Sequence, residues 1–153
     1  AQHNYAILKA LDPFLLDAST LLRTMMDERD ESDMEALRFS HELLREALGH
    51  VPENEELIKS HLKNWDFDRV ALMDIIILNM GIAELTACPS IPERVTVDEC
   101  IELSKEFSSD KSKIFVNGII DKIILDLRSA GRINKSGRGL YIPGLDDEEE
   151  DAQ

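Results

Sequence analysis

The chain has 153 residues and a formal net charge of −14; 43 % of its residues are hydrophobic and only 5 % are aromatic. This length suffices for one domain with a real core, and few glycines and prolines beside many Leu, Ile, Glu and Lys residues favour an all-helical domain. The acidic balance repels phosphate, which argues against non-specific nucleic-acid binding but not against a specific site with a local basic patch.

The sequence shows neither a signal peptide nor a membrane span, and we expect a cytoplasmic protein with no membrane partner. Its two cysteines, Cys88 and Cys100, form no C-x-x-C pair and fit no metal spacing, so we expect reduced thiols. The chain begins at Ala1 rather than at Met, which leaves open that it is a fragment of a longer protein.

The first third of the chain predicts helices, because apolar residues recur at spacings of three and four over residues 5–26. Asp12-Pro13 interrupts this pattern, and Asp is a good N-cap while Pro is favoured at the first helical position. We expect a short leading helix and a second helix from Pro13, with one kinked helix as the alternative. Further helices are predicted over residues 34–51 and 53–62.

The most apolar stretch of the chain covers residues 66–85, and residues 75–83 within it carry no charge. The β-branched run 75–77 would suit a strand, but a possible N-cap at Asp66 and apolar spacings of three and four favour a helix. A helix that is hydrophobic on all sides is buried. This stretch is too short to cross a bilayer, so we expect the central helix of a helical core.

Two more helices are predicted after this stretch. Thr96 and Glu99 fit a capping box, with Thr at the N-cap and Glu three residues later, and this box opens a helix that runs to Phe107. The last helix is predicted over residues 110–130, with Gly131 as its C-cap. Together these elements give an all-α domain, a compact bundle of six to seven helices without a sheet.

Composition also sets the domain boundaries. Residues 1–143 are expected to form the helical domain. Residues 144–153 contain six consecutive acids at 146–151, and we expect them to be an acidic, disordered tail.

No motif in the sequence indicates catalysis. The four histidines are scattered, and there is no G-x-S-x-G, P-loop or G-x-G-x-x-G. We therefore expect no enzyme activity, no metal and no cofactor.

Asp74 is the one carboxylate that stands out, because it lies inside the apolar helix. Burying a carboxylate is costly unless it has a partner. We expect either a structural partner such as Arg69 or Lys122 or an exposed face, with a ligand-binding role as the alternative.

A group of basic residues follows the last helix. Such a group can contact phosphate, or it can complement the negative end of a helix with no ligand at all. An acidic tail folded back on this group would compete with phosphate. The four residues are Arg128, Arg132, Lys135 and Arg138.

Phe115-Val116-Asn117-Gly118 is the sharpest local feature of the last helix. Glycine costs about 1 kcal/mol relative to alanine inside a helix, so Gly118 indicates close packing against the central helix or the approach of a ligand. An aromatic ring such as Phe115 near a helix start can stack on a base. Periodicity alone favours the structural interpretation.

Three blocks at fixed spacing resemble the NusB family of bacterial transcription antitermination factors: DIIILNMGIAEL at 74–85, IPERVTVDECIELSKEF at 91–107 and KIFVNGIIDK at 113–122. The resemblance implies a non-catalytic, all-helical domain of two packed helical sub-bundles. It also implies binding of boxA-type single-stranded RNA in nascent ribosomal transcripts, together with a small-subunit ribosomal protein and, indirectly, the RNA polymerase complex.

The resemblance also implies roles for individual residues. Phe115 matches the RNA-contacting aromatic of the family, Asp74 matches an acidic position near the RNA, and Asp68 lies where another acidic contact can occur. Asn79 stands where the family usually has Arg, which removes a phosphate donor. Lys111 stands where some members have Asp, which restores a positive charge near Phe115.

The front of the chain departs from the family, which opens with an Arg-rich helix. Only Lys9 and Arg23 are basic in the corresponding region. Either the missing helix lies upstream in a longer protein, or this member acts mainly through protein contacts. Our hypothesis is antitermination in ribosomal RNA operons. The alternatives are a protein-interaction domain that has lost RNA binding and an RNA-binding module of a ribosomal RNA methyltransferase.

Overall fold

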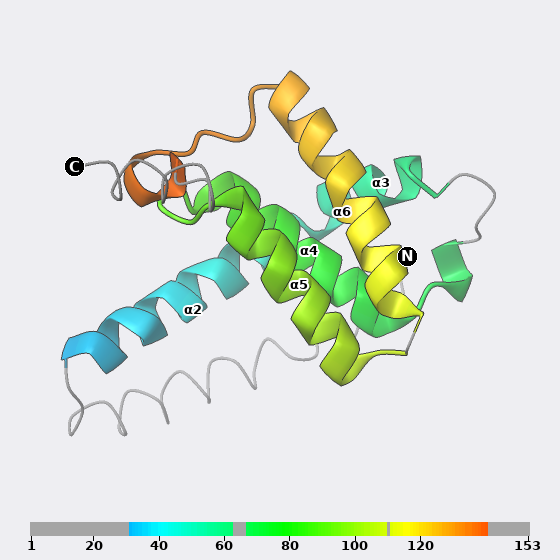
Figure 1. The fold of residues 1–153 in the computed structure, drawn as a ribbon, viewed down its shortest axis with the longest axis horizontal. Coiled ribbons are helices and arrows are strands. Elements are labelled where there is room, and N and C mark those ends of the chain that lie inside the picture. Colours follow the sequence, from blue (N-terminus) through cyan, green and yellow to red (C-terminus); the bar gives the residue numbers. More distant parts are fainter. Residues whose placement is uncertain (1–30, 63–66, 110, 141–153) are drawn as a thin grey trace, which may run out of the picture. The chain divides into compact units, whose positions relative to one another are not determined.

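The computed structural model describes residues 31–62, 67–109 and 111–140, and within these ranges every regular secondary-structure element is a helix (Figure 1). The all-α prediction is therefore confirmed. The described ranges hold five α-helices rather than six to seven, and the predicted helices within residues 5–26 lie outside them. The elements are α2 (Glu31–Gly49), α3 (Val51–Ser60), η1 (Phe67–Arg69), α4 (Leu72–Ala87), α5 (Glu93–Phe107), α6 (Ser112–Ser129) and η2 (Gly137–Leu140).

The chain divides into two compact units, Ala1–Val51 and Pro52–Gln153. Within the first unit, α2 buries Leu43 and Ala47, which lie four residues apart on one face of the helix. The second unit holds the elements from α3 onward and nearly all of the hydrophobic core.

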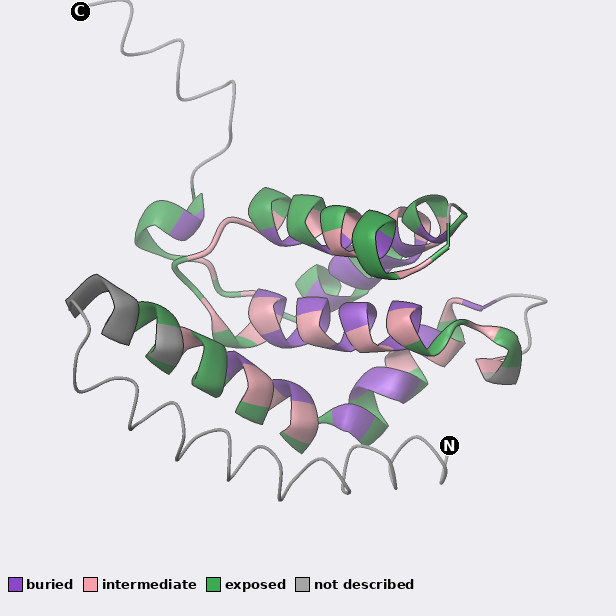
Figure 2. Ribbon diagram, turned by 90° about the horizontal axis from the view of Figure 1, so that it is seen from below, coloured by how far each residue is buried: buried purple, intermediate pink, exposed green. Residues whose placement is uncertain are grey.

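The central helix of the second unit is α4, which packs against both α5 and α6. Figure 2 shows buried and half-buried residues along almost its whole length. The predicted central helix is confirmed, and the strand alternative for residues 75–77 is excluded.

The start of α4 differs from the prediction, because the helix begins at Leu72 and not just after Asp66. The backbone N–H of Val70 donates to the Phe67 carbonyl at 3.1 Å, which closes the short turn η1. Ala71 then takes an extended conformation with ψ of 133°. This extended residue separates η1 from α4, so the apolar spacing across residues 66–71 does not mark a continuous helix.

Gly81 on α4 lies at a close contact of this helix with both α5 and α6. A Cβ atom at this position would lie 2.7 Å from Cys100 Sγ on α5 and 2.8 Å from Ile120 Cδ1 on α6. The prediction that Gly118 packs against the central helix is wrong, because a Cβ there would meet nothing within 4 Å. The close contact therefore depends on a glycine of the central helix itself.

The capping box predicted at Thr96 is also wrong, because α5 begins three residues earlier, at Glu93, with Pro92 as its N-cap. Thr96 lies inside the helix and is only 1 % exposed. Its methyl group lies 3.9 Å from the place of a Cβ at Gly81. Its side chain therefore belongs to the contact between α4 and α5, and it does not cap the helix.

Gly131 terminates α6 as predicted, although it lies one position beyond the C-cap residue, which is Ala130. The φ of Gly131 is +65°, and the backbone N–H of Arg132 donates to the Leu127 carbonyl at 2.8 Å while that of Gly131 donates to the Arg128 carbonyl at 3.0 Å. This pair of bonds is a Schellman motif, which satisfies the last carbonyls of α6.

Residues 132–140, the C-terminal strap, run from the end of α6 to the end of α4. Lys135 Nζ donates to the carbonyls of Cys88 (3.0 Å) and Glu84 (3.4 Å). The positive charge therefore sits at the negative end of the α4 dipole, and burial lowers the pKa of this lysine. At Gly139 a Cβ would clash with the Pro89 carbonyl oxygen, so the strap packs directly on the α4–α5 loop.

Neither cysteine forms a disulfide. Cys100 is buried under α4, and desolvation raises its thiol pKa to about 12, so it stays protonated. Within the described part of the chain, no helix is long and apolar enough to span a membrane.

The two helix glycines give a matched pair of stability measurements. We expect Gly81→Ala to lower the free energy of unfolding by about 1–3 kcal/mol, because the new methyl group overpacks the core. We expect Gly118→Ala to raise it by up to about 1 kcal/mol, because alanine is the better helix former and the space is open. Urea unfolding of both variants measures this, and a neutral Gly81→Ala would contradict the close contact.

Candidate nucleic-acid interface

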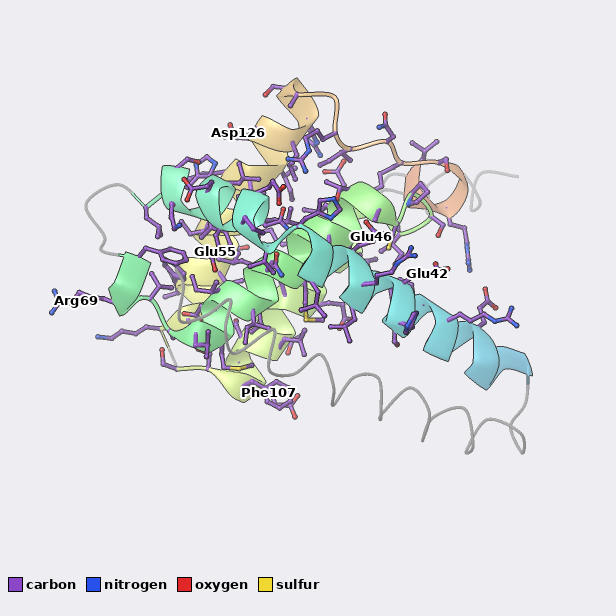
Figure 3. All side chains as sticks on the ribbon, turned by 180° about the vertical axis from the view of Figure 1, so that it is seen from behind. Glu42, Glu46, Glu55, Arg69, Phe107 and Asp126 are labelled. Carbon is purple, nitrogen blue, oxygen red and sulfur yellow. The ribbon has the colours of Figure 1, made fainter. Side chains whose placement is uncertain are left out.

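The junction between α5 and α6 presents an exposed aromatic ring. Phe107 is the last residue of α5 and is 54 % exposed. Figure 3 shows its side chain projecting away from the ribbon at the end of that helix. A solvent-exposed phenylalanine ring can stack on any of the bases, so such a contact does not depend on the nucleotide sequence.

The loop that follows Phe107 is tied to the buried carboxylate of Asp74, which is only 4 % exposed. Ser108 Oγ donates to Asp74 Oδ1 at 2.6 Å, and Ser112 Oγ donates to Asp74 Oδ2 at 3.0 Å. The hydroxyls of Ser108 and Ser109 each lie 2.8 Å from that of Ser112. One carboxylate thus fixes both the end of α5 and the start of α6.

Of the alternatives predicted for Asp74, a structural partner is found, but it is not one of the residues named. The Asp74 side chain is not exposed, and its partners are two serine hydroxyls, not Arg69 or Lys122. Asp74 also lies in the first turn of α4, where the helix dipole stabilises a negative charge. Hydroxyl donors and the dipole together stabilise the buried carboxylate, and no described lysine or arginine forms an ion pair with it.

The start of α6 is basic and exposed. Lys111 occupies the N-cap position and Lys113 the second helical position, and both are exposed. Neither forms an ion pair with another described residue. Phe115 follows one turn later, where its ring is half-buried and packs against the hydrophobic core. Phe107 therefore offers more free ring surface than Phe115.

Asn79 lies in the core layer and is 8 % exposed. Asn54 Nδ2 on α3 donates to Asn79 Oδ1 at 2.7 Å, which joins α3 to α4. Asp68 belongs to the short turn η1. The RNA-binding roles of both residues stay predictions.

The four basic residues near the end of α6 have different surroundings. Arg128 forms a two-nitrogen contact with the Glu93 carboxylate, with the closest pair at 2.8 Å. Lys135 is bound to the end of α4. Arg132 and Arg138 are exposed and form no ion pair with a described residue. Two of the four candidate phosphate contacts therefore have structural partners, and two remain open.

Phe107 is a candidate site residue that the sequence pattern did not single out, because it marked only the end of the helix. The buried residues of α5 are Thr96, Cys100 and Ser104, spaced by four. The next residue at this spacing is Ser108, so Phe107 lies beside the buried face of α5 rather than on it. The run of small residues was the available signal, because it marks the face that lies closest to α4.

No group of three or more His, Cys, Asp or Glu residues in the described ranges is arranged to hold a metal ion. The exposed groups at the junction are the two lysines and the Phe107 ring, and such groups can contact the phosphates and bases of a nucleic acid.

The comparisons with known proteins agree on one family. The family model described as NusB family matches residues 5–125. The transcription antitermination protein NusB of Salinibacter ruber is 40 % identical over 130 residues, which cover 85 % of this chain and 80 % of that protein. The protein of the same name from Myxococcus xanthus is 37 % identical over 101 residues, covering 66 % of this chain and 72 % of that protein.

A relative of the same name from Chloroherpeton thalassium is 34 % identical over 109 residues, covering 71 % of this chain and 52 % of that protein. Among solved structures, T. maritima NusB is similar with a TM-score of 0.57 and 28 % identity, covering 82 % of this chain and 89 % of that one.

The serine–carboxylate network predicts the effect of an isosteric change. We expect Asp74→Asn to lower the free energy of unfolding by about 1–3 kcal/mol, because an amide replaces one acceptor oxygen with a donor facing a hydroxyl. Backbone amides of Ser108, Ser109 and Ser112 should then exchange faster with solvent.

The matched control is Asp121→Asn on α6, an exposed carboxylate with no ion pair to a described residue. It should change stability by no more than about 0.5 kcal/mol. Hydrogen exchange and urea unfolding measure both variants. Equal stability of the two would show that the network does not hold the junction.

Proposed function

Because this chain belongs to the NusB family, we propose that it acts in bacterial transcription antitermination as a non-catalytic RNA-binding protein of the cytoplasm. Its RNA is of the boxA type, single-stranded and part of nascent ribosomal transcripts. It binds together with a small-subunit ribosomal protein and meets the RNA polymerase complex only indirectly. The names of the curated relatives support the antitermination role.

We place the RNA-binding edge at the junction between α5 and α6. The single observation that carries this placement is the exposure of the Phe107 ring beside the basic start of α6. Phe107 stacks on a base, and Lys111 contacts a neighbouring phosphate. The serine network holds both residues in register through Asp74, so little conformational freedom is lost on binding.

The other candidate residues have supporting roles in this proposal. Asp74 acts by positioning the junction, because both of its oxygens already bind serine hydroxyls. Phe115 packs behind the edge, and Asn79 supports α4 from α3. Arg132 and Arg138 are the open phosphate contacts for RNA that extends beyond the junction, and Asp68 on η1 is a further acidic contact.

We further propose that residues 1–143 form one NusB-like domain of two packed helical sub-bundles, followed by the acidic tail 144–153. A net charge of −14 and an asparagine at position 79 favour a second candidate, a protein-interaction domain that has lost RNA binding. The two candidates differ in whether any boxA-type RNA is bound.

One titration tests the proposal. Binding of boxA-type RNA is measured with and without the ribosomal partner at two salt concentrations. We expect Phe107→Ala to weaken binding by roughly 5- to 150-fold, which corresponds to about 1–3 kcal/mol for one stacked base. We expect Lys111→Gln to weaken it less and to reduce the salt dependence by about one phosphate contact.

Leu125→Ala is the matched control, because it removes an exposed apolar side chain from α6 away from the junction. It should leave binding unchanged. If no RNA binds even with the partner present, the protein-interaction candidate is favoured. If Phe115→Ala weakens binding in a folded protein while Phe107→Ala does not, the stacking ring is Phe115.

A further inference from the structure

Residues of α5 and α6 line a groove along the two helices whose ends meet at the RNA-binding edge (Figure 1). The volume of this groove is about 650 Å³, which is typical of sites that hold small ligands. Val97 and Ile101 of α5 lie half-buried in its wall, and α6 contributes the amide of Asn117 and the carboxylate of Asp121. The groove therefore offers apolar surface and polar groups together.

The remaining charged side chains of the groove neutralise one another. They form the pairs Arg94–Asp98 and Arg128–Glu93. The amide and the carboxylate from α6, by contrast, form no side-chain hydrogen bond or ion pair with a described residue. A phosphate therefore meets no open cation in this groove, whereas a neutral ligand with N–H donors meets an open carboxylate.

Three side chains on one side of α6 connect the RNA-binding edge with this groove. Lys113, Asn117 and Asp121 follow one another at intervals of four residues, so each lies about 6 Å from the next along the helix axis. Lys113 is exposed and forms no ion pair with a described residue. A strand of RNA that stacks on Phe107 can therefore place a neighbouring base in the groove while Lys113 contacts the phosphate between the two bases.

We propose that this groove is a guanine site, which takes one base of the bound RNA by its Watson–Crick edge. On that edge guanine carries the acceptor O6 beside two adjacent donors, N1–H and N2–H. The carboxylate of Asp121 accepts from both donors at once, and the amide of Asn117 donates to O6. The other standard bases present no two adjacent donors on this edge, so the pair of side chains selects guanine.

Apolar side chains complete the site. Val97 and Ile101 pack against the face of the base, as apolar groups do around a base that has left its stack. The base lies beside Asn117 and Asp121 and does not extend to Leu125, which is one turn further along α6. The inference rests on the proposed function for the source of the base. It adds a base-specific contact to the stacking on Phe107, which does not depend on sequence.

The first experiment replaces each guanine of boxA-type RNA in turn by inosine, which lacks the N2 amino group. At one position we expect the replacement to weaken binding to the wild-type chain roughly tenfold, because it removes one hydrogen bond to a carboxylate. In Asp121→Ala the same replacement should change binding by roughly twofold at most, because the acceptor is absent. An equal loss in both chains would overturn the inference.

The matched control is Glu99→Ala, which removes one exposed negative charge from α5 outside the groove. Loss of a negative charge by itself favours the binding of a polyanion. We therefore expect Glu99→Ala to bind the unmodified RNA as tightly as wild type or slightly more tightly, and Asp121→Ala to bind it roughly tenfold more weakly. If Asp121→Ala binds as tightly as Glu99→Ala, the carboxylate accepts no hydrogen bond from the RNA and the inference fails.

The second experiment needs no RNA strand. The isotope-labelled chain is titrated with guanosine monophosphate and, separately, with inosine monophosphate, while nuclear magnetic resonance follows the side-chain amide of Asn117. We expect guanosine monophosphate to shift this resonance in the wild-type chain, inosine monophosphate to shift it less, and neither to shift it in Asp121→Ala.

The two experiments separate the guanine site from the proposed function. If guanosine monophosphate shifts the Asn117 resonance while boxA-type RNA does not bind, the proposed function fails and the guanine site stands with a free nucleotide as its ligand. If boxA-type RNA binds but neither it nor the mononucleotide shifts this resonance, the guanine site is overturned and the proposed function stands.

Discussion

The close approach of three helices at Gly81 is the contact on which the rest of the structure depends. Cys100 of α5 and Ile120 of α6 occupy the space that any side chain at this position would need. A glycine there lets both helices pack directly against α4, so two helices share one apolar helix as their packing partner. This packing brings the end of α5 and the start of α6 together over the first turn of α4.

Three sets of polar groups on α4 make contacts to other elements. Asp74 holds the α5–α6 junction, Asn79 accepts from Asn54 of α3, and the last carbonyls of α4 accept from Lys135 of the strap. Buried polar groups are costly unless they are paired, and these pairs are directional. They fix the register of the surrounding helices, whereas apolar packing alone would tolerate small shifts.

An acidic protein that binds RNA must confine its positive charge to a small region. Here several cations are neutralised by neighbouring carboxylates, and the open ones include the two lysines at the start of α6. Long-range attraction of a polyanion is therefore weak, so the proposed RNA binding depends on short-range contacts such as stacking. The need for a partner protein in the proposed function is consistent with that weak attraction.

Sequence periodicity determined much of this fold. It identified α4 as a buried helix, located α2, α3, α5 and α6 within a few residues, and marked Gly131 as the residue that terminates α6, because these features depend on local spacing and local backbone geometry. The three family blocks also stand in the sequence itself. The sequence did not reveal that Thr96 is a contact residue, nor which glycine is crowded, because both depend on a helix distant in sequence.

The site shows the same division. The sequence singled out Asp74 and the start of α6, since a carboxylate in an apolar helix and a glycine near a helix start are locally unusual. Only the tertiary structure decided that Asp74 binds serines, and that Phe107 rather than Phe115 has the more exposed ring. The reason is that the spacing of residues in the sequence shows which of them share one face of a helix. How closely the neighbouring helix packs then decides which of these side chains are buried.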